Sequence, residues 1–248
     1  MWKSDFHKPL KEKYNDLMRR EPYSLGSFVH VIKRGNRGLA ITRDERDRQR
    51  FLLSLTHLND AHTVDNWYRD LDHRTLLSAF ERPKSWHKQK KLTEIVCFCL
   101  VGNHFHLLLK EINESGISRF MQKLGTSLAK TYNEKYKETG TLFQGAYKSR
   151  TINDDVYFRY LSAYIQVKNC FETYPKRKLD YAANFDKMFE WAMRCPYSSL
   201  GDFMNVLKRS ITDQQFLSEI FTSEEYGVFC RDFISGRATY ELSLDSVE

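Results

Sequence analysis

The sequence lacks the features of a membrane or secreted protein. No segment approaches the roughly 18 apolar residues that a membrane-spanning helix needs, and the N-terminal stretch is charged throughout, so neither a membrane helix nor a signal peptide is expected. The five cysteines are scattered and form no CxxC pair, which argues against a disulfide framework and against a zinc ribbon. We therefore expect a protein of the reducing cytoplasm.

What is present is enough for a folded, basic protein. Of the 248 residues, 41% are hydrophobic and 14% aromatic, which is sufficient to fill a core and excludes a wholly disordered chain. Lysine and arginine number 39 against 32 aspartate and glutamate residues, for a net charge of +7. This excess favours a polyanionic partner such as nucleic acid, although many basic proteins bind none.

Composition along the chain indicates one main domain with appendages. We expect a charged N-terminal arm over 1–22, a main domain over 23–175 that contains a basic, exposed insertion at 60–91, and a helical C-terminal extension over 176–248. The insertion and the extension could each pack on the core or contact DNA, and the sequence leaves both open.

Hydrophobic periodicity predicts the elements of the main domain. Alternating apolar residues predict strands over 28–33, 94–100 and 104–110, whereas 3–4 spacing predicts helices over 42–59, 115–139 and 153–168. Residues 141–150 are predicted as a loop or strand, and a short helix is expected near 71–80. This order predicts an α+β fold in which helices cover an antiparallel sheet.

The pair His104 and His106 lies in one of these predicted strands. Side chains alternate between the faces of a strand, so the two imidazoles share one face while Phe105 points to the other. Two imidazoles on one rigid face suit a divalent metal ion. The alternative is a pair of satisfied surface histidines, and the HxH pattern alone does not decide between the two.

A basic and aromatic stretch follows, between residues 123 and 150. Cations can contact phosphates while aromatic rings stack on unpaired bases. Lys148 and Arg150 are the better candidates, because Lys130 and Lys137 fit an exposed helix face equally well. The residues expected to contact DNA are Lys123, Phe143, Tyr147, Lys148, Arg150 and Lys168.

Tyr164 lies on the apolar face of the predicted helix 153–168. A tyrosine hydroxyl can attack a phosphodiester and form a covalent phosphotyrosine. A tyrosine at such a position is more often a core residue, and spacing alone cannot select one of the 14 tyrosines.

Several motifs, taken together, resemble one family. The segment Val101–Leu108 reads VGNHFHLL, which is similar to the NHxHLL signature of single-tyrosine HUH transposases, especially the REP-associated tyrosine transposases. Further similarities follow in the same order at Ser118–Gln122, Tyr132–Tyr136, Gly140–Gly145, Tyr157–Ile165 and Pro196–Ser199.

This resemblance implies a fold, a site and a reaction. It implies a ferredoxin-like antiparallel sheet with helices on one face, His104 and His106 on a central strand as metal ligands, and Tyr164 on a later helix as the nucleophile. The implied cofactor is Mg²⁺ or Mn²⁺. The implied reaction is cleavage and rejoining of single-stranded DNA, often beside a hairpin, through a 5′-phosphotyrosine, by a monomer or homodimer.

The sequence departs from the family at two positions. Four residues after the nucleophile the family presents Asn or Gln as a third metal ligand, but here that residue is Lys168, whose ammonium has no lone pair. A regular helix would direct Gln166 and Asn169 away from the face of Tyr164. Ala146 also replaces the basic residue expected after LFQG.

Two other functions follow from the same residues. One is a DNA-binding relative that recognises structured single strands without cutting them, in which Lys168 neutralises a phosphate. The other is an unrelated metal-dependent phosphodiesterase in which His104 and His106 serve a water nucleophile, although no carboxylate-rich motif accompanies them.

Overall fold

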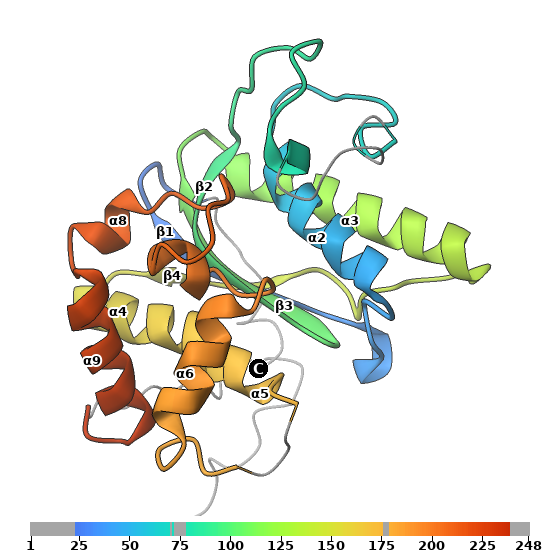
Figure 1. The fold of residues 1–248 in the computed structure, drawn as a ribbon. Helices are drawn as coiled ribbons and strands as arrows, with labels where there is room; N and C mark the ends of the chain where they lie inside the picture. Colours follow the sequence, from blue (N-terminus) through green and yellow to red (C-terminus); the bar gives the residue numbers. More distant parts are fainter. Residues whose placement is uncertain (1–22, 70, 72–77, 176–178, 239–248) are drawn as a thin grey trace, which may run out of the picture.

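A four-stranded antiparallel sheet forms the centre of the protein in the computed structural model, which describes residues 23–69, 71, 78–175 and 179–238 (Figure 1). The strands are β1 (Phe28–Arg34), β2 (Thr93–Val101), β3 (His104–Glu111) and β4 (Lys148–Ile152), in the order β2-β3-β1-β4. This is an α+β fold with an antiparallel sheet, as predicted, and the strand within 141–150 begins only at Lys148. The predicted arm at 1–22 lies outside the described residues.

The two central strands, β1 and β3, carry apolar residues on both of their faces. Phe105, Leu107 and Leu109 of β3 are wholly buried on one side, and Leu108 is wholly buried on the other. A strand with two apolar faces requires cover on both sides of the sheet.

One face is covered by α2 (Glu45–His57) and α3 (Gly116–Tyr136), as a ferredoxin-like arrangement requires. Asp44 begins α2, because its side chain accepts a hydrogen bond from the backbone N–H of Asp47. The helix therefore starts three residues later than Thr42, where the pattern had placed the boundary. Helix α3 ends at Lys137, in the left-handed conformation, before Gly140 is reached.

The other face is also covered by helices, so the expectation of helices on one face only is wrong. It carries α4 (Asp155–Ala163), a π-helix (Tyr164–Lys168) and α5 (Asn169–Glu172), which pack on β2 and β3. Four C-terminal helices complete this layer: α6 (Phe185–Arg194), α7 (Leu200–Phe203), α8 (Gln215–Ser218) and α9 (Ser223–Ile234). Figure 1 shows the two layers on either side of the sheet, and the C-terminal helices share their core with the second layer.

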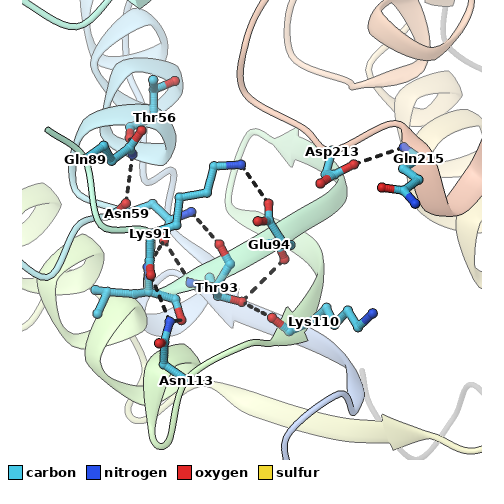
Figure 2. Close-up of polar contacts among 11 residues, drawn as sticks. Thr56, Asn59, Gln89, Lys91, Thr93, Glu94, Lys110, Asn113, Asp213 and Gln215 are labelled. Atoms are coloured by element: carbon cyan, nitrogen blue, oxygen red, sulfur yellow. Dashed lines mark hydrogen bonds and ion pairs between the residues drawn. The ribbon is translucent and has the colours of Figure 1, made fainter.

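The segment predicted as an exposed insertion runs from α2 to β2, and it is not wholly exposed, because Trp67, Leu71, Ala79 and Phe80 are buried in the core. Asn59 fixes the return, because its amide oxygen accepts from the N–H groups of Leu92 and Thr93 and its nitrogen donates to the carbonyl of Thr93. Gln89 adds bonds to the carbonyls of Thr56 and Asn59 (Figure 2). A short 3₁₀ turn at Ser78–Phe80 is described, whereas most of the helix expected near 71–80 lies outside the described residues.

Two further expectations concern membranes and thiols. In the described part of the chain no helix is both long and apolar enough to cross a bilayer. All five cysteines are free and buried, and Cys97 and Cys99 share one face of β2.

Candidate metal and nucleophile site

His104 and His106 lie side by side on the face of β3 that the π-helix covers. Their ring centroids are 4.9 Å apart, and Phe105 between them points into the opposite core. His106 is 1% exposed and His104 is 9% exposed. The structure therefore gives the pair the shared face that strand alternation predicted.

Asn103 orients the first of the two imidazoles. Its side-chain oxygen lies 2.6 Å from Nδ1 of His104, and its amide nitrogen donates to the carbonyl of Gly38 at 3.2 Å. With the amide nitrogen engaged in this way, Nδ1 of His104 is the donor and carries the ring proton. Nε2 of His104 is then the nitrogen with a lone pair for a metal.

His30 on β1 contacts the second imidazole, that of His106. Its Nε2 lies 3.0 Å from Nδ1 of His106, and the two rings stack at 5.3 Å between centroids. Sequence reasoning missed this residue. The alternation in β1 places His30 and Arg34 on one face, but only the register that pairs Ile32 with His106 brings that face beside the histidines.

Burial keeps these imidazoles neutral. It lowers the pKa of His106 well below the ordinary value, and the neighbouring His30 and His104 lower it further. The pKa of His30 falls to about 3, first through burial and then through the charge of Arg150. Neutral imidazole is the form that binds a metal ion, so this burial suits the predicted role.

Tyr164 packs directly against this pair. Its ring centroid lies 5.7 Å from that of His106 in an edge-to-face arrangement, and the residue is 1% exposed. Lys168 places its ammonium over the Tyr164 ring at 4.8 Å and forms a long ion pair with Glu172 at 3.9 Å. Histidines and tyrosine, far apart in sequence, thus meet at one place.

The helix that carries Tyr164 changes its geometry at that residue. Residues Tyr164–Lys168 form a π-helix, and the N–H of Asn169 donates to the carbonyl of Tyr164. In this geometry the residue five positions on, rather than four, follows one turn later. Asn169 is therefore the residue one π-helical turn after Tyr164, and its buried amide nitrogen has no hydrogen-bond partner among the described residues. Gln166 points elsewhere, since it donates to the hydroxyl of Tyr226 on α9.

The Pro196–Ser199 element joins this helix to the edge of the sheet. The hydroxyl of Ser198 donates to the carbonyl of Gln166 at 2.8 Å, and the hydroxyl of Ser199 accepts from the N–H of Phe98 at 2.9 Å. The backbone of Tyr197 and Ser199 adds two further bonds to β2. The irregular helix is thus held against the sheet by two buried hydroxyls.

Three of the expected DNA contacts lie on this same face. Arg150 pairs directly with His30, and Lys148 pairs with Ile32, so both share the face of the histidines. Lys168 is the third. Arg34, which pairs with His104, adds a cation that the sequence interpretation did not select.

The other three lie on the opposite side of the sheet. Phe143, predicted as a stacking surface, is 7% exposed and packs edge-to-face on Phe105, so little of its ring is accessible. Tyr147 packs beside the same core, with its hydroxyl 3.3 Å from that of Ser118. Lys123 on α3 donates to two backbone carbonyls, at Asp60 and His62.

The donor set suits a divalent metal in part. Among the described residues there is no group of three histidine, cysteine, aspartate or glutamate side chains placed to hold a metal ion. The imidazoles of His104 and His106, each engaged through Nδ1, do fit as ligands through Nε2. The buried amide of Asn169 is an additional oxygen donor of the kind that Mg²⁺ and Mn²⁺ accept.

Part of the chain is similar to a known family. Residues 71–168 match the family model described as "Transposase IS200 like". The matched segment contains both histidines and Tyr164 and ends at Lys168, while His30 and the C-terminal helices lie outside it.

The chain was also compared with curated proteins and with solved structures. None of the curated proteins matches the chain. One similar solved structure is titled "Structure of the REP associates tyrosine transposase bound to a REP hairpin"; it is 13% identical, covers 79% of this chain and 96% of its own, and superposes with a TM-score of 0.44.

Proposed function

We propose that the chain is a metal-dependent transposase that cleaves and rejoins single-stranded DNA beside a hairpin through a covalent 5′-phosphotyrosine on Tyr164. The observation that carries this proposal is the contact between Tyr164 and His106, 5.7 Å apart between ring centroids, within an IS200-like transposase segment. We place the protein in the cytoplasm, as a monomer or homodimer.

The proposed step exchanges one phosphodiester for another. The phenolic oxygen of Tyr164 attacks the phosphorus, the bond from phosphorus to the 3′ oxygen breaks, and the phenolic proton is balanced by the proton that the 3′ hydroxyl gains. Rejoining reverses these steps with the 3′ hydroxyl of another strand. Lys148 and Arg150, on the same face, are placed to hold the phosphates on either side.

His104 and His106 would hold the metal through Nε2, and Asn169 would supply an oxygen ligand in place of the residue four positions after Tyr164. When bound, Mg²⁺ or Mn²⁺ polarises the scissile phosphate and stabilises the charge that develops on it. Lys168, which the π-helix displaces from the ligand position, would then neutralise a phosphate oxygen.

Burial adds a requirement to this function. Tyr164 is 1% exposed, so a DNA strand reaches its hydroxyl only after a local opening of the covering layer. We therefore expect cleavage to be slower than DNA binding.

A denaturing gel tests the proposal. Full-length protein with Mn²⁺ and a labelled hairpin carrying a single-stranded tail should form an adduct that survives denaturation. Tyr164→Phe should abolish the adduct. Tyr160→Phe, on the same helix but packed on Phe229, should retain it. An adduct that persists in Tyr164→Phe would overturn the nucleophile assignment.

A second candidate function is DNA binding without cleavage. The burial of Tyr164 and the lysine at position 168 favour it, because a fixed cation can neutralise a phosphate without a metal. Tight hairpin binding that a chelator leaves unchanged, with no adduct under any metal, would support this function and exclude the first.

A further inference from the structure

A groove lies on the side of the sheet opposite to the histidines. It has a volume of about 630 Å³ and runs between the outer face of α3, the end of α2 and the loop over residues 62–69. The loop returns to the core through the hydrogen bonds of Asn59 and Gln89, so one wall of the groove is tied to the sheet (Figure 2).

Cations and hydroxyls dominate its lining. The cationic side chains are Arg50, Arg69, Lys123 and Lys130, and the hydroxyl side chains include Thr126, Ser127 and Thr131 of α3. Among the described residues that line the groove, Glu134 is the one acid. This composition suits an anion that offers many oxygen acceptors.

Arg50 is the most informative of these residues. Its guanidinium lies over the ring of Tyr68 at 4.2 Å and that of Trp67 at 5.3 Å. Its Nε is buried and has no hydrogen-bond partner among the described residues, and the carboxylates of Glu134 and Asp47 act on it electrostatically without a direct ion pair. Burial lowers the pKa of Arg50. A cation held in place by two rings, yet left unpaired, is prepared to receive an anion.

The remaining cations differ in role. Lys123 is committed to the carbonyls of Asp60 and His62 and therefore shapes the wall. Lys130 and Arg69 are exposed and free to meet a ligand at the mouth. A ligand that reaches from Arg50 to both must be extended and must carry more than one negative charge.

We propose that this groove binds the phosphodiester backbone of DNA at a second place, separate from the cleavage site. The proposal rests on the function proposed above, because that function supplies DNA as the ligand. Arg50 would take one phosphate through its fork, hydroxyls of α3 would donate to phosphate oxygens, and Lys130 would neutralise the next phosphate. DNA would thereby be anchored on one face of the sheet while another part of it reaches Tyr164 on the other.

Fluorescence anisotropy of a tailed hairpin, in buffer with chelator and over a series of salt concentrations, tests the proposal. The double variant Arg50→Gln/Lys130→Gln should bind about 10-fold to 100-fold more weakly and lose about two units of the slope of log affinity against log salt. Lys187→Gln, an exposed lysine on α6, is the matched control and should change neither value. Arg50→Lys should restore the salt slope but only part of the affinity, because lysine lacks the fork.

The design separates this proposal from the proposed cleavage. Tyr164→Phe and His106→Ala should bind with unchanged salt slope, so their loss of adduct and the loss of binding in the groove variants are independent results. If Arg50→Gln fails to fold, the surface pair Arg69→Gln/Lys130→Gln gives the same test. Unchanged DNA affinity in folded groove variants would overturn the proposal; capture of polyglutamate by the intact groove alone would assign it instead to an acidic protein.

Discussion

Polar side chains are buried on one side of the sheet and accessible on the other. On the face of β3 that carries His104 and His106, imidazoles and a phenol are buried under helices, and burial lowers the pKa of His106. On the other side, beyond α2 and α3, cations stand in an open groove of about 630 Å³. The apolar layer that contains Phe105 separates the two.

This difference in burial matches the different physical requirements of the two proposed sites. A metal site and a nucleophile depend on fixed geometry and low local dielectric, which burial provides. Phosphate binding depends on accessible positive charge, which burial would remove. Each requirement can be tested by substituting residues on one face and measuring the properties assigned to both.

The largest effect should come from the cover of the histidine face. Arg209 donates to Asp202 and to the carbonyl of Ser198 from a site where the two charged side chains are 5% and 2% exposed. Arg209→Ala should destabilise the protein by about 3–5 kcal/mol, because it strands a buried carboxylate. Chemical denaturation measures this change in the free energy of unfolding. Arg194→Ala, which removes an exposed partner of Glu190, should change stability by no more than about 0.5 kcal/mol; similar losses in both would contradict the difference in burial.

The next effect concerns the orientation of the proposed metal ligands. His30→Ala removes the partner of Nδ1 of His106 and should lower Mn²⁺ affinity about 10-fold to 100-fold, as measured by calorimetry. DNA affinity in the presence of chelator should stay unchanged. His87→Ala, exposed and remote, is the control. Unaltered Mn²⁺ affinity in His30→Ala would show that the histidine face is structural.

A smaller effect should follow at the edge of the sheet. Ser199→Ala leaves the N–H of Phe98 without its acceptor in a buried place and should lower the free energy of unfolding by about 1–3 kcal/mol. The exposed Ser235→Ala serves as control and should leave it unchanged. Equal melting midpoints for wild type and Ser199→Ala would refute the role of this hydroxyl.

The smallest effect should be at Lys148, on the histidine face. Lys148→Ala should weaken DNA binding uniformly across sequences and reduce the salt slope by about 1, against no change for Lys187→Ala. A loss as large as that of the groove variants would break the comparison, because it would place the main DNA grip beside the histidines.

Local patterns predicted strands β1, β2 and β3 and the shared face of the histidines. They failed where the answer depends on contacts between distant segments. His30 becomes a partner of His106 only through the register of β1 on β3, and no local pattern fixes that register. The burial of the Phe143 ring likewise depends on distant residues, because nothing in its own segment reveals the core that covers it.

Tyr164 is a second case in which local sequence patterns do not reveal a tertiary contact. A tyrosine on an apolar helix face is compatible with a core role, and it is buried. Its selection came from resemblance to a family, whereas its contact with His106 is a property of the tertiary structure. The π-helix was unpredictable for a physical reason, since apolar spacing over five residues fits a regular helix equally well.

The π-helix at Tyr164–Lys168 suggests how a single deletion could change the spacing of the site residues. A turn closed by five residues instead of four is the form that one inserted residue takes inside a helix, with the flanking turns left in place. Deleting Lys168 should therefore restore a regular helix without disturbing α4 or α5, and would set the present Asn169 four residues after Tyr164. A single-codon deletion would thus convert the departure in this chain into the spacing that its family resemblance implies.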